Sequence, residues 1–393
     1  MRLTRIQLHN FRNFHHLDIS FPPGPSLVVG DNAQGKTNLL EAIYLLSALR
    51  PFRAETEAQL IHREAIASGL SMARVTGEVM RAQGPLRLEV VVGMRQNALG
   101  GHVTKVVKVN GVARRAQEAV GLFSVVPFSV QDLELISGSP ALRRRYLDSL
   151  LGRIDARYLM ARQRLEKVLL QRNHLLRRLR ERAAHPDELD FWDDTLAQEA
   201  AYIVWARAQA VQALSPLAAA AHEILGDGEE ISIVYLPRLG PEATDALSHG
   251  PEALAQAFLL DLRRMRPQEV AAGMTLLGPQ RDDLRLLLEG MEAAGYASRA
   301  QERTLALSLR LAEAHYLHQV RGDSPVLLLD DVMSELDARR RRRLLEPLLQ
   351  HEQVILTGTE AEAFPRDLVA TASLYTVTQG VVTPVSRAST PEP

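Results

Sequence analysis

The chain has 393 residues, no cysteine and a formal net charge of −1. The missing cysteines exclude a disulfide framework and thiolate metal sites, and the balanced charge gives no global signal for nucleic acid. No apolar run approaches the roughly 20 residues of a membrane helix, and residues 1–5 lead into a β-like stretch instead of an apolar signal segment. We therefore expect a cytoplasmic protein without a membrane partner, folded around one large core or two moderate ones.

Short strands dominate the first third of the chain. Asn110-Gly111 predicts a hairpin turn between two β-like stretches. The stretches with strand-like composition are 2–8, 17–21, 26–29, 73–80, 86–94 and 103–109.

A phosphate-binding loop of the form G-x-x-x-x-G-K-[ST] follows the strand at 26–29 and opens a helix predicted over 38–49. Its backbone N–H groups are expected to cradle nucleotide phosphates, with Lys36 on the β- and γ-phosphates and Thr37 on Mg²⁺. A glycine-rich turn without ligand is the alternative, but Lys36 is one of only four lysines in the chain. The residues expected to bind the nucleotide here are Gly30, Asp31, Asn32, Ala33, Gln34, Gly35, Lys36, Thr37 and Asn38.

The middle of the chain is mainly helical. Apolar residues recur at helical spacing from about 141 to 221, with a turn at Pro186-Asp187. A short β-like piece at 231–236 and a helix at 252–265 follow. Only about two to three heptads can be drawn, fewer than a confident coiled coil needs, so we expect a packed helical lobe.

A second nucleotide motif lies far from the first. The apolar run at 325–329 ends in Asp330 and Asp331, which predicts a buried parallel strand with acids at its C-terminal end, and Asp330 is expected to help hold Mg²⁺. Alone, the pattern also fits an ordinary strand end. Lys36 and Asp330 must nevertheless meet around one Mg-nucleotide, so the two ends of the chain should fold together.

The predicted fold is therefore α/β, an ATPase head interrupted by an inserted lobe. We expect a first part of the head at 1–135, the inserted helical lobe at 136–265 and a second part of the head at 266–382. The polar, proline-rich residues 383–393 are predicted to be disordered.

With these motifs in place, the chain resembles the ABC-type ATPase heads of the structural-maintenance-of-chromosomes (SMC) class. Among them it is most similar to the RecF family of bacterial recombination mediators. Each block that carries the resemblance is weak alone, but their order and spacing make it specific. The blocks are 8–13, 35–42, 132–135, 138–140, 143–148, 278–283, 298–303 and 330–337.

The resemblance implies a head-to-head dimer in which the signature helix of one protomer caps the ATP of the other. Ser298 and Arg303 are the expected nucleotide-binding residues of this helix, with Ser298 facing the partner's γ-phosphate. Ala300 stands where the signature usually has glycine, and Ala33 replaces a glycine common in the family's phosphate loop. The alternative for the segment is a plain helix start.

The resemblance also implies the hydrolytic residues. Asp331 occupies the position of the carboxylate that orients water, and Glu335 lies close enough in sequence to substitute in part. Gln131 is the candidate for the loop glutamine that contacts both Mg²⁺ and water. Thr357 or Thr359 stands where many ABC heads carry a histidine that senses the γ-phosphate.

Arginine clusters are the candidates for DNA contact, through the phosphate backbone. Each cluster also fits a solvated helix face in an arginine-rich protein. No aromatic residues interleave with them, so a stacking platform for single strands is not expected, and the scattered histidines predict no metal site. The candidate DNA-binding residues are Arg143, Arg144, Arg145, Arg177, Arg178 and Arg180.

The resemblance implies a slow, switch-like ATPase of recombinational DNA repair that uses ATP and Mg²⁺. It would form an ATP-dependent homodimer on double-stranded or gapped DNA and promote recombinase loading with RecR-like and RecO-like mediators. One rival is a transporter ATPase subunit, which is usually shorter and places the two nucleotide motifs closer together. The other is an ATPase coupled to a nuclease, which needs a further acidic α/β domain that the sequence after Asp337 does not provide.

Overall fold

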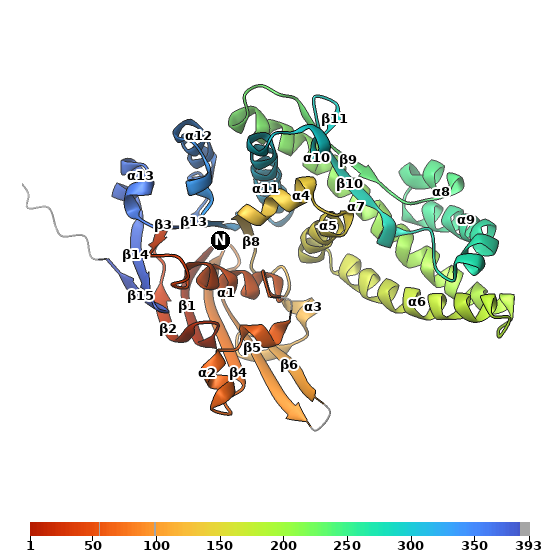
Figure 1. Cartoon of the computed structure of the whole chain (residues 1–393), viewed down its shortest axis with the longest axis horizontal. Coiled ribbons are helices and arrows are strands. Elements are labelled where there is room, and N and C mark those ends of the chain that lie inside the picture. The colour runs from red at the N-terminus through yellow and green to blue at the C-terminus, as the bar shows by residue number, and fades with distance from the viewer. Residues whose placement is uncertain (55, 98–99, 386–393) are drawn as a thin grey trace, which may run out of the picture. The chain divides into compact units, whose positions relative to one another are not determined.

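The computed structural model describes residues 1–54, 56–97 and 100–385, and its internal contacts divide the chain into two units (Figure 1). The first unit combines Met1–Asp132 with Arg310–Pro393, and the second is Leu133–Leu309. The two ends of the chain thus fold together. The second boundary differs from the expected one at 265/266, because β10 (Asp283–Leu288) pairs along its whole length with β9 (Ile231–Leu236). Residues 266–309 therefore belong with the inserted segment.

The first unit contains two six-stranded sheets. One is antiparallel, in the order β2-β1-β4-β5-β6-β7, and the other has the order β15-β14-β3-β13-β12-β8, parallel except for β15. The antiparallel strands are β1 (Arg2–Phe11), β2 (Phe14–Ser20), β4 (Met72–Arg81), β5 (Gly84–Asn97), β6 (Gly100–Val109) and β7 (Val112–Arg114). Those of the second sheet are β3 (Gly24–Val29), β8 (Val125–Ser129), β12 (Val326–Asp330), β13 (Gln353–Gly358), β14 (Ser373–Thr378) and β15 (Val381–Pro384).

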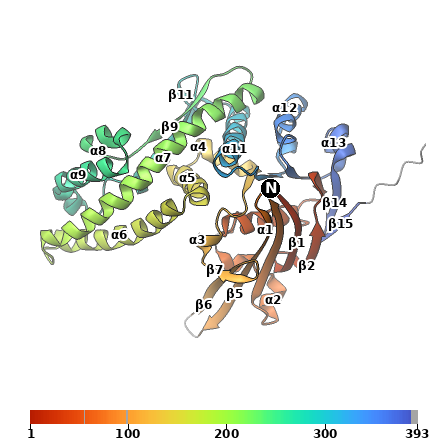
Figure 2. The same cartoon turned by 180° about the vertical axis from the view of Figure 1, so that it is seen from behind.

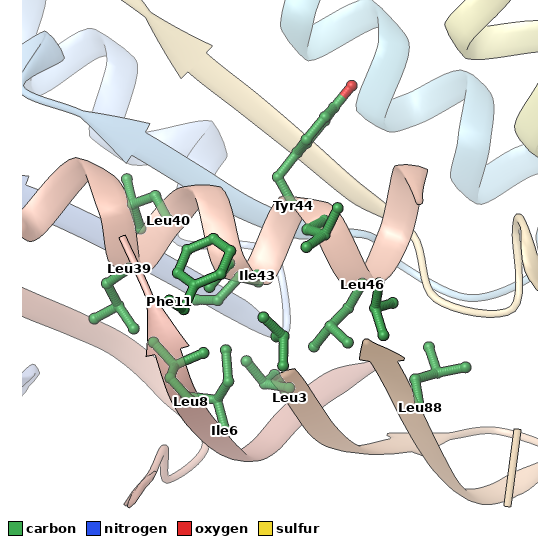
Figure 3. Packing of buried hydrophobic residues seen from close by; sticks show 14 of the residues in the cluster. Leu3, Ile6, Leu8, Phe11, Leu39, Leu40, Ile43, Tyr44, Leu46 and Leu88 are labelled. Carbon is green, nitrogen blue, oxygen red and sulfur yellow. The ribbon is translucent and has the colours of Figure 1, made fainter. Parts of the chain in front are cut away.

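Helix α1 (Lys36–Ala48) contacts strands of both sheets, and its apolar residues from Leu39 to Leu46 are buried, several of them labelled in Figure 3. Leu39, Ile43 and Leu46 pack in one core cluster with Leu3 of β1. Gly77 of β4 makes room for the helix, since a Cβ there would lie 2.5 Å from Leu46 Cδ1. A helix that is hydrophobic on all faces is stable only in such a buried position, so this core fixes where the phosphate loop ends.

The order β3-β13-β12-β8 brings motifs that are distant in sequence to one edge of the sheet. Leu356 of β13 pairs with Leu27 of β3 and with Leu329 of β12, while Asp330 pairs with Ser129 of β8. In parallel sheets, ligands bind at the C-terminal ends of the strands. The other helices of this unit are α2 (Arg63–Ala67), α3 (Ala116–Ala119), α12 (Ala338–Leu348), α13 (Arg366–Thr371) and the second half of α11 (Arg299–Arg321).

The second unit is built mainly of helices. Helix α7 packs against α6 and α9, and also against β9 (Figure 2). The helices are α4 (Leu133–Ser137), α5 (Pro140–Ile154), α6 (Ala156–Arg180), α7 (Leu189–Leu225), α8 (Pro241–Ala246), α9 (Pro251–Ala272), α10 (Ala293–Tyr296) and the first half of α11. Strands β9, β10 and β11 (Met291–Glu292) form a three-stranded sheet. The helical stretch from 141 breaks at Asp155, whose side chain accepts the N–H of Tyr158 and caps α6.

Two buried ion clusters hold the second unit together. Arg172 is fully buried and pairs with Asp193 at 2.8 Å and with Glu269 at 2.6 Å. Arg207 pairs with Asp148 at 2.8 Å and with Asp282 at 2.9 Å. Removing one partner of such a pair leaves an uncompensated buried charge, so the block at 278–283 has a structural role inside this unit.

The tail that was predicted to be disordered, residues 383–393, begins inside a strand. Thr383 and Pro384 lie in β15 and pair with Thr376 and Tyr375 of β14, while residues 386–393 lie outside the described residues. Of the helices that the structure describes, none has the length and apolar character needed to span a membrane.

Candidate nucleotide-binding site

The phosphate loop connects β3 to the N-terminus of α1. Lys36 Nζ, on the first residue of the helix, donates to the carbonyls of Gly30 at 2.6 Å and Asp31 at 3.2 Å. Lys36 is only 4% exposed, because the residues of the loop surround its side chain. Gly35 caps the helix with a φ of 123°, and a Cβ there would lie 2.6 Å from Asn13 Nδ2. The N–H groups of the first helical turn are thus left for an anion.

The loop is braced from two sides. Asn13 Nδ2 donates to the Gln34 carbonyl, and Asn38 Nδ2 donates to Asn13 Oδ1, both at 2.8 Å. From the turn between β14 and β15, the Gln379 N–H donates to Gln34 Oε1 at 2.6 Å and the Gly380 N–H donates to the Gln34 carbonyl at 3.0 Å. Gln34 therefore positions the loop and is not itself among the residues that line the pocket.

The structure brings the two nucleotide motifs into direct contact. Thr37 Oγ1 lies 2.8 Å and 3.0 Å from the two carboxylate oxygens of Asp330. Thr357 Oγ1, from β13, donates to Asp330 Oδ1 at 3.1 Å and accepts the N–H of Asp331 at 3.0 Å. Arg53 completes the group with an ion pair of 3.0 Å to Asp330 Oδ2. These oxygens are the hard ligands that Mg²⁺ prefers.

Asp331 lines the pocket in a left-handed backbone conformation with a φ of 54°. Partial burial raises the pKa of its carboxyl group. The positive charge of Lys36 lowers this pKa, the negative charge of Asp330 raises it further, and the positive charge of Arg53 lowers it. A carboxylate with a raised pKa is a better hydrogen-bond acceptor for water. Glu335, its expected helper, has a side chain that lies outside the described residues.

A pocket of about 320 Å³ lies over the phosphate loop. Three of its lining residues, Arg12, Glu41 and Arg53, were not predicted. Glu41 on α1 is 1% exposed and accepts from Arg12 Nε at 2.6 Å and from the Arg53 N–H at 3.0 Å. Arg12 and Glu41 fall inside blocks 8–13 and 35–42, which carry the family resemblance and so could have indicated a role for both residues. No sequence motif includes Arg53.

The other expected hydrolytic residues take different places. Gln131 is exposed in a short 3₁₀ turn directly after β8, the strand beside β12. Thr357 is buried and supports Asp330, whereas Thr359 is exposed. Gln131 and Thr359 therefore stay predictions, and Thr357 has an observed structural contact.

The signature segment lies in the second unit and opens α11. The Ser298 N–H donates to Gln301 Oε1 at 2.9 Å, and the Gln301 N–H donates to Ser298 Oγ at 3.3 Å. This reciprocal pair is a capping box, so the helix-start interpretation holds whether or not the segment also binds nucleotide. Ser298 is exposed and Arg303 is partly buried, and their nucleotide contacts stay predictions.

The arginine cluster on α5 is largely engaged within the protein. Arg143 is 6% exposed, forms a two-pronged ion pair with Asp283 at 2.8 Å and 3.0 Å, and donates to the Gly138 carbonyl. Arg144 donates to the Asp282 carbonyl at 2.7 Å, and Arg145 is exposed. The prediction that Arg143 belongs to the DNA-binding surface is therefore wrong, because its guanidinium is buried and paired with Asp283.

The cluster at the end of α6 has the opposite character. Arg177, Arg178 and Arg180 are all exposed. Arg178 donates to the Ala183 carbonyl at 2.8 Å and lies 4.0 Å from Glu188. Exposed pairs of this kind are weak, so the cluster can exchange its partners for phosphates.

Two histidines and one glutamate lie close together, although the scattered histidines of the sequence predicted no metal site. The ligand atoms of His15, His62 and Glu64 lie within 4.8 Å of one another. The His62 Nδ1 accepts the Glu64 N–H at 3.1 Å, which puts the proton of the neutral ring on Nε2. The rings of His15 and His62 also lie against each other, with centroids 3.8 Å apart and 33° between their planes. Neither the hydrogen bond of His62 nor the contact between the two rings directs ring lone pairs toward one ion. We therefore do not assign a metal site to this cluster.

Comparisons with known proteins match this chain over nearly its whole length. The model of the family RecF/RecN/SMC N terminal domain matches residues 2–383. The DNA replication and repair protein RecF of Roseiflexus castenholzii is 40% identical, over 98% of this chain and 100% of the relative. The solved structure of the recombination mediator protein RecF-ATPrS in the RecFOR pathway has 31% identity and a TM-score of 0.86 over 98% of both chains. That of RecF-ATP has 32% identity and a TM-score of 0.84, over 98% of this chain and 97% of the other.

Proposed function

This chain belongs to the RecF family of SMC-like ABC-type ATPases, and we propose that it binds and hydrolyses ATP in the recombinational repair of DNA. The observation that carries the proposal is the contact of Thr37 with Asp330, which joins the two nucleotide motifs beside Lys36. The related structures with bound nucleotide support ATP as the ligand.

The residues present fit a magnesium ion. A threonine hydroxyl and a buried carboxylate meet at the mouth of the phosphate loop, and both are oxygen ligands. Thr37 and Asp330 would hold the ion, and Gln131 is a further candidate ligand. When bound, the ion supplies charge neutralisation for the phosphates. Lys36 and the α1 N-terminus bind the phosphates, and Asp331 orients water.

ATP is expected to drive a head-to-head dimer in which Ser298 of one protomer faces the γ-phosphate held by the other. The start of α11 supports this role because Ser298 is exposed there and the N-terminus of a helix favours an anion. We predict that the chain is mostly monomeric without nucleotide or with ADP and dimeric with ATP. Ser298→Arg should block the dimer through bulk and lost N-terminal access while ATP still binds the monomer. Sedimentation with each nucleotide measures this, and an unaltered dimer in the variant would place the interface elsewhere.

DNA binding is expected to be electrostatic and coupled to the dimer, because pairing two heads doubles the number of basic arms. The slope of log affinity against log salt should steepen with ATP, by roughly 0.9 per added phosphate contact. Replacing Arg177, Arg178 and Arg180 by glutamine should flatten the slope without changing ATPase activity in the absence of DNA. Replacing the exposed Arg263 and Arg264 on α9 is the matched control. If the α6 variant has the same salt slope as the unmodified protein, the DNA-binding surface lies elsewhere, and Arg145 is the next candidate to replace.

The clamp would act near gaps or junctions in double-stranded DNA and promote recombinase loading with RecR-like and RecO-like mediators, with slow turnover in the cytoplasm. The experiment that tests the whole proposal is DNA binding by the pure protein with and without ATP, alongside its molecular mass in both states. Co-purification of an integral membrane protein would favour the transporter alternative, and metal-dependent DNA cleavage would favour the nuclease-coupled one.

A further inference from the structure

The charge balance at Asp330 is set by an arginine that no sequence motif predicts. Asp330 is 4% exposed, and a buried carboxylate needs a compensating cation. The nearby Lys36 ammonium is directed at the carbonyls of Gly30 and Asp31. The Arg53 guanidinium supplies the ion pair to Asp330, at 3.0 Å.

Three donors surround this carboxylate. Thr37 Oγ1 contacts both oxygens, at 2.8 Å and 3.0 Å; Thr357 donates to Oδ1, and Arg53 contacts Oδ2. A carboxylate offers about four lone-pair sites. One site is therefore left for a further ligand, but a cation there lies close to the guanidinium of Arg53, and the two positive charges repel each other.

Arg53 is the contact that can leave most easily. Thr37 and Thr357 have short side chains fixed on α1 and β13. Arg53 reaches Asp330 with a long side chain that is 35% exposed. Its backbone is anchored separately, because Glu41 accepts the N–H groups of Arg53 at 3.0 Å and Ala54 at 3.3 Å. The guanidinium can thus move without loss of the loop that carries it.

We propose that Arg53 is an exchangeable counter-ion: it neutralises Asp330 when no divalent cation is bound there, and it competes with a divalent cation for this carboxylate. This inference rests on the proposed nucleotide site. Because the guanidinium and a divalent cation repel each other at one carboxylate, the arginine weakens metal binding by competition, and it compensates the negative charge of Asp330 when no cation is bound. It thereby links occupation of the metal position to movement of the Arg53 side chain.

The test is Mn²⁺ binding to the nucleotide-free, full-length chain, followed by electron paramagnetic resonance of the free ion. Arg53→Gln keeps the length of the side chain and removes its charge. It should bind Mn²⁺ about three- to fivefold more tightly than the unmodified protein, the range that a partly exposed ion pair supports. Without metal the variant should melt at a lower temperature than the unmodified protein, and saturating Mn²⁺ should close that gap.

Two further variants define the site. Arg87→Gln, an exposed arginine on β5, should leave Mn²⁺ affinity unchanged, and Asp330→Asn should remove the binding. If Arg53→Gln does not fold, Arg53→Lys provides the test. Lysine has a shorter side chain that contacts Asp330 less well, so the Arg53→Lys protein should also bind Mn²⁺ more tightly than the unmodified protein. Equal or weaker Mn²⁺ binding by the folded variant, or binding that survives Asp330→Asn, would overturn the exchange. ATP binding measured on the same samples separates the two ideas, because its absence in the unmodified protein would overturn the proposed function instead.

Discussion

Lys36→Ala should weaken ATP binding by at least about tenfold and abolish ATP-dependent dimerisation and DNA binding. The ammonium is the positive charge that we expect the phosphate loop to place beside the β- and γ-phosphates. A hydrogen bond between charged groups is worth about 1.5–3 kcal/mol, which corresponds to roughly ten- to over a hundredfold in affinity. Titration of the variant with a fluorescent ATP analogue measures the loss.

The structure adds a control to this prediction. Lys36 is not an exposed loop lysine, as it is 4% exposed and closes the loop through the carbonyls of Gly30 and Asp31. Its removal therefore leaves carbonyl groups without a donor, and melting curves must show that the variant is folded. Lys36→Arg, which retains charge, should bind ATP better than Lys36→Ala. A folded Lys36→Ala protein with unchanged ATP affinity would overturn the site assignment.

Sequence patterns predicted what is local. The phosphate loop was found because its residues are contiguous and sit between an apolar strand and an apolar helix. The meeting of Thr37 with Asp330 also followed, although 293 positions separate them, because both motifs have to serve one Mg-nucleotide. The strands of the antiparallel sheet were predicted from their composition, to within a few residues at their ends.

Pairing across the fold was not visible in the sequence. Arg143 and exposed Arg145 are near neighbours in sequence, yet Asp283, 140 positions away, neutralises only Arg143. The boundary of the second unit was misplaced for the same reason, since β10 finds its partner strand β9 across two intervening helices. Arg53 stands in no motif, and its role depends on Glu41 and Asp330, which approach it only in the folded chain.

Asp331→Asn should slow ATP hydrolysis by at least about tenfold, about 1.4 kcal/mol on the barrier, while ATP binding persists. The substitution keeps the size of the side chain and removes the carboxylate that we expect to orient water. Because ATP is bound but not cleaved, the ATP dimer should accumulate on DNA. Single-turnover hydrolysis and the rate of release from DNA are the two measurements. Asp367→Asn, an exposed carboxylate on α13, is the matched control and should change neither.

The pH dependence gives a sharper form of the same test. Burial raises the pKa of Asp331 above its ordinary value, so the active carboxylate form is lost as the pH falls through that raised pKa. Hydrolysis by the unmodified protein should decline at a higher pH than an ordinary aspartate would produce, and Asp331→Asn should lose this acidic limb. Because Glu335 is expected from its place in the sequence to substitute in part, the double change with Glu335→Gln is the stricter comparison. Hydrolysis at the normal rate in Asp331→Asn, or release from DNA as fast as in the unmodified protein, would mean that Asp331 does not control the lifetime of the ATP state.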